Sequence, residues 1–332
     1  MERKVIKLDF NITNRCNFRC RHCCFRSGEV NLIELAFEKI KSVLTEFKDL
    51  GGRRIDITGG EATMRPDCFE IVRLCKILGF KTELVTNASL LNEETLKQYK
   101  DIGLDGIAVS LDGSNYEVYG QIRPIPEKLY RKIITNIELA AKYNFYTKVN
   151  TVVFNSNLPD LIHITRLAIA LGAKEQGFYY FSPIGRGDCF TSNIPDPLKW
   201  IKLIREFLIE FYNKIEISME TPIIESEFTR KIDTHCYMER PWHLQILPDG
   251  NVYPCAIMCA HQKPLANLHQ QTLRQIWENE KQLADYYQSQ TQPLFDQWGG
   301  CVNYPKLKDK ISGGQYSFVC LCKKFNLKEL TK

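Results

Sequence analysis

The sequence predicts an α/β fold built on a mainly parallel sheet, and three observations support this. Short β-rich runs alternate with helical patterns through the first two-thirds of the chain. Six strand–helix pairs follow one another without interruption, and parallel strands need such crossover connections. Polar motifs follow several of the strands, at the edge where α/β sheets place their ligands. An open doubly wound sheet and a curved, barrel-like sheet both satisfy this pattern.

The expected strands are short runs rich in β-branched and aromatic residues, bounded by turn residues. In chain order they cover residues 5–13, 54–58, 81–86, 106–110, 146–153 and 178–182. The expected helices carry apolar residues at intervals of three and four. They cover residues 33–49, 68–78, 93–102, 129–142, 158–171 and 198–214. The last of them begins after a break marked by Pro195 and Pro197.

The alternation stops after about residue 215, where Cys, Pro and aromatic residues become frequent. Only a helix at 273–288 and a hairpin at 244–253, turning on Asp249 and Gly250, are predicted there. A metal site would offset the weak apolar core, because the free energy of metal binding becomes folding free energy. We therefore expect two tightly packed domains, residues 1–215 and 216–332.

The composition narrows the class of protein. The chain has 332 residues, 44% hydrophobic and 25% charged, which excludes wholesale disorder and fibrous repeats. Its net charge of +5 is too small to indicate nucleic-acid binding by itself. The absence of a signal peptide and of any apolar run of about 18 residues predicts a cytoplasmic protein without a membrane segment. In a reducing compartment, its 13 cysteines are more often metal ligands than disulfides.

Three cysteines, Cys16, Cys20 and Cys23, stand close together in the loop after the first expected strand. Their C-x3-C-x2-C spacing lies among polar residues, which indicates a loop rather than a buried strand. Such a loop suits a cubane iron–sulfur cluster with three protein ligands and one open iron. Zinc is the competing interpretation, but it would need a fourth ligand at matching spacing.

This segment resembles the radical S-adenosylmethionine (radical SAM) enzymes, and the resemblance extends over about residues 5–215. It implies a partial (β/α)6 TIM-type barrel, in which the three cysteines hold a 4Fe–4S cluster and S-adenosylmethionine (SAM) chelates the fourth iron. His22 would lie near the adenine. Gly59, Gly60 and Glu61 match the family's G-G-E segment, where glycines let backbone carbonyls approach an ammonium group.

Further segments match the family in order along the chain. Asn87 belongs to a T-N-G-like segment in which Ala88 replaces the glycine, and Arg123 fits an I-R-G arginine although Pro124 replaces the glycine. A glycine–arginine–glycine turn at 185–187 resembles that of peptide-modifying members. The resemblance implies that the cofactor-binding residues are His22, Gly59, Gly60, Glu61, Asn87, Ser110, Asp112, Arg123 and Asn150.

The six C-terminal cysteines resemble those of the SPASM and twitch extensions, which hold auxiliary iron–sulfur clusters. Six cannot supply two four-thiolate clusters, so we expect one auxiliary 4Fe–4S cluster. Its expected ligands are Cys236, Cys255, Cys320 and Cys322, with Cys301 as a substitute. Structural zinc in the same cysteines is the alternative, because both kinds of site use tetrathiolate ligands.

The resemblance implies that an electron from the reduced cluster cleaves SAM to a 5′-deoxyadenosyl radical. We expect this radical to abstract hydrogen from a residue of a ribosomally made precursor peptide, leading to epimerisation, crosslinking or backbone excision. The alternative is a small-molecule dehydrogenase or a cofactor-biosynthesis enzyme. A redox-neutral reaction would need a thiol as hydrogen donor. Cys24, Cys189 and Cys259 have no assigned role and could serve, and Cys259 and Cys189 are the best-placed candidates.

The expected partners follow from this chemistry. They are the precursor peptide, a separate peptide-recognition protein, and a reductant such as flavodoxin or ferredoxin. Neither nucleic acid nor a membrane is expected. The sequence alone leaves open the substrate, the product, the hydrogen abstracted and the oligomeric state.

Overall fold

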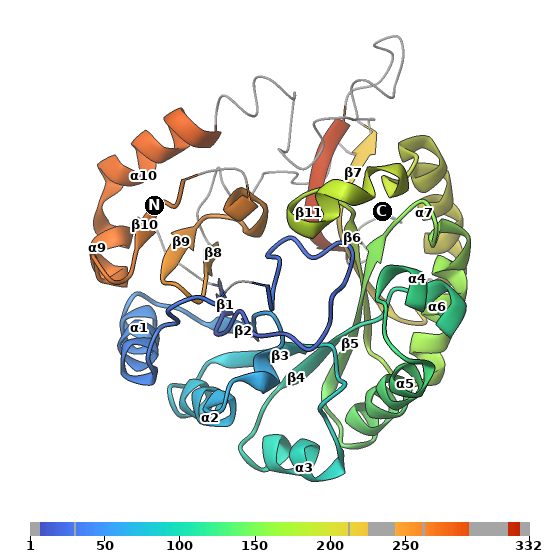
Figure 1. The fold of residues 1–332 in the computed structure, drawn as a ribbon, viewed down its shortest axis with the longest axis horizontal. Coiled ribbons are helices and arrows are strands. Elements are labelled where there is room, and N and C mark those ends of the chain that lie inside the picture. The colour runs from blue at the N-terminus through green and yellow to red at the C-terminus, as the bar shows by residue number, and fades with distance from the viewer. Residues whose placement is uncertain are drawn as a thin grey trace.

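One curved sheet organises the part of the chain that the computed structural model describes, residues 7–29, 31–211, 213–224, 243–260, 263–291 and 318–325. Its eleven strands stand in the order β10-β9-β8-β1-β2-β3-β4-β5-β6-β7-β11. Figure 1 shows the sheet curling into an incomplete barrel with helices on its outer side. The predicted α/β fold, a partial barrel, is confirmed.

Seven parallel strands in sequence order form the body of this barrel. They are β1 (Lys7–Asn11), β2 (Arg54–Thr58), β3 (Lys81–Thr86), β4 (Gly106–Ser110), β5 (Tyr146–Val153), β6 (Glu175–Tyr180) and β7 (Glu216–Ile224). The strands at 54–58, 81–86, 106–110 and 146–153 have the predicted bounds. Because helices connect each strand to the next from β1 to β7, all seven point the same way.

The helices of the barrel pack their apolar stripes against the outer face of the sheet. They are α1 (Phe37–Asp49), α2 (Cys68–Ile77), α3 (Glu93–Asp101), α4 (Tyr116–Ile122), α5 (Glu127–Lys142), α6 (Leu161–Ala170) and α7 (Pro197–Phe211). In α1 the buried side chains Ile40, Val43, Leu44 and Phe47 repeat at helical spacing. The short helix α4 is absent from the prediction; Asn115 begins it by accepting a hydrogen bond from the Val118 amide at 3.0 Å.

The C-terminal part adds strands to both edges of the same sheet. β8 (His243–Ile246) pairs in parallel with β1, and β9 (Asn251–Tyr253) and β10 (Ala266–Asn267) follow in antiparallel order. At the other edge, β11 (Phe318–Phe325) pairs antiparallel with β7. The hairpin predicted at 244–253 is confirmed as β8 and β9.

Two features of the tail differ from the prediction. β7 continues the parallel sheet beyond residue 215, although its Glu216, Glu220 and Pro222 obscure the strand pattern in the sequence. The helix expected at 273–288 is divided into α9 (Leu273–Glu278) and α10 (Glu280–Tyr286). The break falls at Asn279, whose side-chain oxygen accepts a hydrogen bond from the Gln282 amide at 3.0 Å and so begins a new helix.

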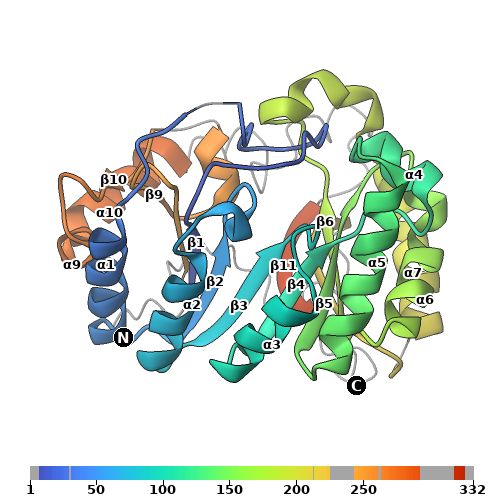
Figure 2. The same cartoon turned by 60° about the horizontal axis from the view of Figure 1, so that its bottom comes forward.

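The loop between β1 and α1 lies across the end of the barrel where the parallel strands finish (Figure 2). It contacts distant parts of the chain there, since Arg21 donates its amide to the Ile122 carbonyl at 3.1 Å. This loop carries the three clustered cysteines. Within the described residues, no helix has the length and apolar character needed to cross a membrane.

Candidate functional site

Each cysteine of the loop accepts a hydrogen bond at its sulfur. The amides of Phe18 and Ser27 donate to the sulfurs of Cys16 and Cys23, both at 3.4 Å. Arg123 donates from Nη1 to the Cys20 sulfur, also at 3.4 Å. Donors aimed at sulfur stabilise a thiolate more than a thiol, so the loop suits three metal-bound thiolates.

The spacing of the three thiols distinguishes a cluster from a single metal ion. They lie close enough that the charges of Cys20 and Cys23 help to raise the pKa of Cys16 to about 11, after burial as the largest cause. Yet in the described part of the chain no three His, Cys, Asp or Glu side chains converge tightly enough for one metal ion. Three neighbouring thiolates can hold three corners of a cubane, whereas a structural zinc ion would need a fourth ligand.

The glycines after β2 let the backbone there pack directly against the cysteine loop. The Gly60 amide donates to the Thr13 carbonyl and the Glu61 amide to the Arg15 carbonyl, both at 2.8 Å. A Cβ on Gly60 would collide with the Arg15 carbonyl, so only glycine fits. Neither glycine lines the cavity described below, and their predicted contact with SAM remains a prediction.

Glu61 joins the ends of β2 and β3 beneath the loop. It is 1% exposed, and its carboxylate accepts hydrogen bonds from the Thr63 and Thr86 hydroxyls, both at 2.6 Å, and from the Asn87 amide at 2.7 Å. Burial is the largest influence on Glu61 and raises its pKa, against these donors. Asn87 in turn donates to the Asn17 side chain in the cysteine loop at 3.0 Å. Both predicted cofactor residues therefore support the loop from below.

Asp112 and Arg123 form a buried ion pair next to the loop. Arg123 Nε lies 2.6 Å from Asp112 Oδ2, and Asp112 Oδ1 accepts the Val152 amide at 2.8 Å. Burial alone would lower the pKa of Arg123, yet Asp112 and Cys20 raise it well above the ordinary value. The arginine thus stays charged beside Cys20, whereas neither member of the pair lines the cavity.

His22 is the predicted adenine neighbour, and it lines the cavity. Burial and then Arg123 lower its pKa to about 4, so the ring is neutral at physiological pH. Its Nε2 lies 3.3 Å from Arg123 Nη2, and its ring packs against Phe154 at 5.3 Å between centroids. Its Nδ1 is buried and has no hydrogen-bond partner among the described residues, as expected for a side chain that meets a ligand.

The turn after β6 holds the other side of the cysteine loop. The Arg186 amide donates to the Cys23 carbonyl at 2.9 Å, and its Nε donates to the Cys20 carbonyl at the same distance. Gly185 has φ +61°, and a Cβ there would collide with the Cys24 carbonyl. The glycine–arginine–glycine segment is therefore part of the cluster site, a role that its sequence resemblance to peptide-modifying enzymes did not specify.

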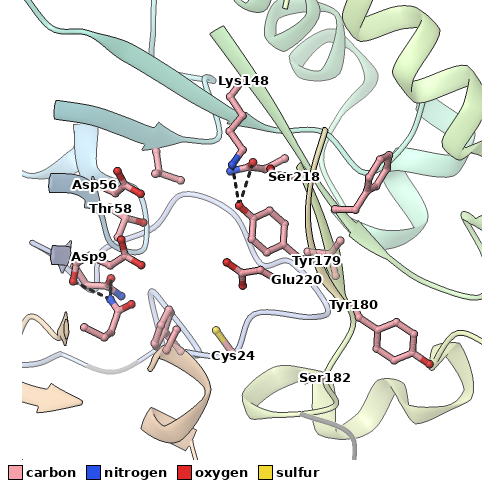
Figure 3. A pocket seen from close by; sticks show the side chains of 18 of the residues that line it. Asp9, Cys24, Asp56, Thr58, Lys148, Tyr179, Tyr180, Ser182, Ser218 and Glu220 are labelled. Atoms are coloured by element: carbon pink, nitrogen blue, oxygen red, sulfur yellow. Dashed lines mark hydrogen bonds between the residues drawn. The ribbon is translucent and has the colours of Figure 1, made fainter. Parts of the chain in front are cut away.

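A cavity of about 520 Å³ lies inside the barrel, below this loop (Figure 3). Alternate residues of the strands point into it, as the two-residue period of a strand requires. Asn150, the predicted SAM contact on β5, lines it together with His22 and Cys24. Ser110 stands beside Asn150 in the register of β4 and β5 but does not line the cavity.

The cations of the cavity wall are shared among carboxylates. Lys7 Nζ lies 2.9 Å from Asp9 and 2.7 Å from Asp56, while Arg54 contacts Asp56 at 3.0 Å and Glu83 at 3.4 Å. These contacts occupy both cations on the β1–β2 side of the wall.

Lys148 is held on the opposite side. Its Nζ lies 3.0 Å from Glu175 and donates to the Tyr179 hydroxyl at 3.2 Å. Burial would lower the pKa of Lys148, but Tyr179, Glu175 and Glu83 raise it. Figure 3 shows Lys148 and Tyr179 joined in this way, with Glu220 pointing into the cavity nearby.

The two thiols predicted as hydrogen donors do not line the cavity. Cys189 is exposed in the turn after β6, and Cys259 lies in the short helix Ala256–Ala260 with its sulfur 3.8 Å from the Cys255 carbonyl. Burial and then the nearby Cys24 raise the pKa of Cys259. Cys24 is the cavity-lining thiol, and sequence reasoning left it unassigned.

The predicted auxiliary ligands are only partly within the described residues. Cys255 is half-buried and follows β9, whereas Cys236 and Cys301 lie outside the described residues. Cys320 and Cys322 are on strand β11, as expected for a C-x-C pair on an extended segment, and Cys322 stands opposite Glu220 in register. The auxiliary ligand set therefore remains a prediction.

Two family models match the chain. The model of the radical SAM superfamily matches residues 10–168, which include the cysteine loop and β1 to β5. The model of SPASM, an iron–sulfur cluster-binding domain, matches residues 236–301, and its limits coincide with Cys236 and Cys301.

Similar proteins carry several activities. The chain is 27% identical over 291 residues to an AdoMet-dependent heme synthase of Methanosarcina barkeri, covering 81% of each protein. It is 30% identical over 255 residues to AlbA, an antilisterial bacteriocin subtilosin biosynthesis protein of Bacillus subtilis. That match covers 75% of this chain but 54% of AlbA, so the chain spans about half the length of that relative.

Solved structures share the fold. Streptococcus suis SuiB bound to S-adenosylmethionine has a TM-score of 0.71 at 15% identity, covering 86% of this chain and 68% of SuiB. The protein anSMEcpe with bound AdoMet and a peptide has a TM-score of 0.65 at 20% identity, covering 83% of this chain and 81% of the other. At these identities the likeness establishes the architecture.

Proposed function

The chain belongs to the radical SAM superfamily and carries a SPASM iron–sulfur cluster-binding domain, and from this premise we propose that it modifies a residue of a ribosomally made precursor peptide. Epimerisation, crosslinking and backbone excision are the reactions considered. When bound, the reduced cluster and SAM supply a 5′-deoxyadenosyl radical that removes a hydrogen atom from the substrate.

The residues of this chain hold and position the reacting groups. Cys16, Cys20 and Cys23 would ligate the cluster, and Arg123 would donate to the Cys20 thiolate. His22 and Asn150, with Ser110 and the backbone at 59–60, would contact SAM. The neutral His22 ring would add no charge beside the positively charged sulfonium, and its free Nδ1 offers a hydrogen bond.

The main support for a peptide substrate is that the cations lining the cavity are already paired with carboxylates. Lys7, Arg54 and Lys148, the cations among its described lining residues, each already contact carboxylates. The chain is also similar to a probable GTP 3′,8-cyclase of Sulfurisphaera tokodaii. Heme and GTP, the compounds in the names of these two kinds of relative, carry carboxylates or phosphates, and such groups favour free cations. A peptide segment needs none, and the match to AlbA, a bacteriocin biosynthesis protein, extends over three-quarters of the chain.

The second candidate is a small-molecule dehydrogenase or cofactor-biosynthesis enzyme. It is favoured by one observation, the 81% coverage of the heme synthase of Methanosarcina barkeri. For either function we propose one auxiliary 4Fe–4S cluster on Cys236, Cys255, Cys320 and Cys322, with Cys301 as substitute. The end of the SPASM match at Cys301 favours that substitute.

The test is co-expression with short reading frames from the neighbouring genes, followed by mass spectrometry and chiral amino-acid analysis of each peptide. We expect one peptide to change in mass, or in residue chirality with deuterium uptake from deuterated water. The change should disappear when the three loop cysteines are replaced by Ala. Peptides that stay unchanged, together with consumption of an iron porphyrin or of GTP by the reconstituted enzyme, would contradict the proposal.

A further inference from the structure

Glu220 is the carboxylate in the cavity that the internal ion pairs do not use. None of the described residues forms a hydrogen bond or an ion pair with its carboxylate. It stands on β7 directly beside Tyr179 of β6 in the strand register, and its side chain points into the cavity (Figure 3). The side chain is solvent-exposed, although the surrounding wall is close enough for burial to raise its pKa.

Among the described residues that line the cavity, carboxylates outnumber cations by one, and Glu220 is the carboxylate without a partner. In the described part of the chain, four carboxylates and three lysine or arginine cations line the cavity. Lys7 and Arg54 are shared among the three carboxylates of β1, β2 and β3, Asp9, Asp56 and Glu83. Lys148 is neutralised by Glu175 behind the wall.

The surroundings of Glu220 disfavour its charged form when no cation is close to it. Burial, the largest influence, and the charge of Asp9 raise its pKa, whereas Lys7, Lys148 and His243 lower it from a distance. A charge in such a place is costly unless a partner of opposite sign comes close. The neighbouring hydroxyl of Tyr179 donates to Asn150 at 3.4 Å, so Glu220 also lies near the predicted SAM contact.

We propose that Glu220 binds the ammonium or guanidinium group of a Lys or Arg side chain in the peptide substrate. This inference rests on the proposed function and names the class of peptide segment that enters the barrel. The basic side chain would supply the missing positive charge of the cavity. Its backbone would then be held near the end of β5, where the resemblance implies SAM.

The experiment is selection of a random peptide library displayed on messenger RNA against anaerobically reconstituted holoenzyme with SAM. Wild-type enzyme should enrich Lys or Arg at one position. Glu220→Gln should reduce binding of the enriched peptides by about 30-fold or more, the loss typical of removing one partner from a charge pair that the bound peptide buries. Glu220→Lys should shift the preference toward Asp or Glu.

Glu216→Gln is the matched control, because it removes the same charge from the same strand but outside the cavity. Iron content and SAM binding of each variant verify that the fold is intact. Enriched peptides without a basic residue, or a basic preference that survives Glu220→Gln, would overturn the inference and leave the proposed function standing. Failure of the wild type to enrich any peptide would overturn both.

Discussion

At the scale of single residues, the predicted cofactor residues separate into two groups. His22 and Asn150 line the cavity, whereas Glu61 and Asn87 support the cysteine loop and Asp112 pairs with Arg123. The sequence could indicate that these residues gather at the strand ends, because parallel strands finish at one edge. It could not separate contact from support, since that depends on which hydrogen bonds each side chain makes across the fold.

Cys24 illustrates what spacing alone does not reveal. It follows a ligand cysteine directly and has no position of its own in the motif. In the structure it lines the cavity, and Cys259 lies near it. If the reaction is redox-neutral, a substrate carbon radical would take the hydrogen atom of a thiol. The resulting sulfur radical would then need one electron from the flavodoxin or ferredoxin reductant and one proton from water.

We therefore predict a division of roles among three thiols, measured on the modified peptide in deuterated water. Cys24→Ala should still form 5′-deoxyadenosine but give no deuterated product. Cys259→Ala should lower the number of turnovers, because its thiol lies near both Cys24 and Cys255 of the predicted auxiliary cluster. Cys189→Ala is the control, since that thiol is exposed outside the cavity. Normal deuterium uptake by the Cys24 variant would exclude it as the donor.

At the scale of elements, the cysteine loop is held by backbone from several strand ends. The glycines after β2 and the turn after β6 contact it from two sides, and Asn87 after β3 contacts it from below. The sequence predicted β2 to β5 to the residue, because each is a short run with β-branched residues bounded by turn residues. It missed β7, because Glu216, Glu220 and Pro222 obscure the strand pattern there.

Gly185→Ala should test whether the turn after β6 holds the cysteine loop in the conformation that binds iron. The substitution places a Cβ at positive φ and against the Cys24 carbonyl, so the loop must move and bound iron should fall by about half of the eight irons expected for two cubanes. Gly103→Ala is the control: it carries a similar positive-φ cost of about 1–2 kcal/mol, but its Cβ would come no closer than 3.9 Å to a neighbour.

Iron content, SAM binding and the thermal unfolding midpoint should be measured for both variants. Equal loss of iron in the two would contradict the role of the Gly185 turn.

At the scale of the whole molecule, the sheet is shared between the two predicted domains. β8 pairs with β1 and β11 with β7, so the C-terminal part extends the barrel at both edges. The cysteine pattern of the tail predicted cluster chemistry, in line with the SPASM match. It could not predict this pairing, because strand partners far apart in sequence are chosen by tertiary packing rather than by local pattern.

The central claim is that Cys16, Cys20 and Cys23 hold the cluster at which SAM reacts. The most direct measurement compares iron content and 5′-deoxyadenosine formation of the anaerobically reconstituted wild type with the triple Cys→Ala variant. The wild type should bind about eight irons as two cubanes and cleave SAM, while the variant should retain about four and cleave none. Cleavage of SAM by the triple variant at a rate near that of the wild type would contradict the account.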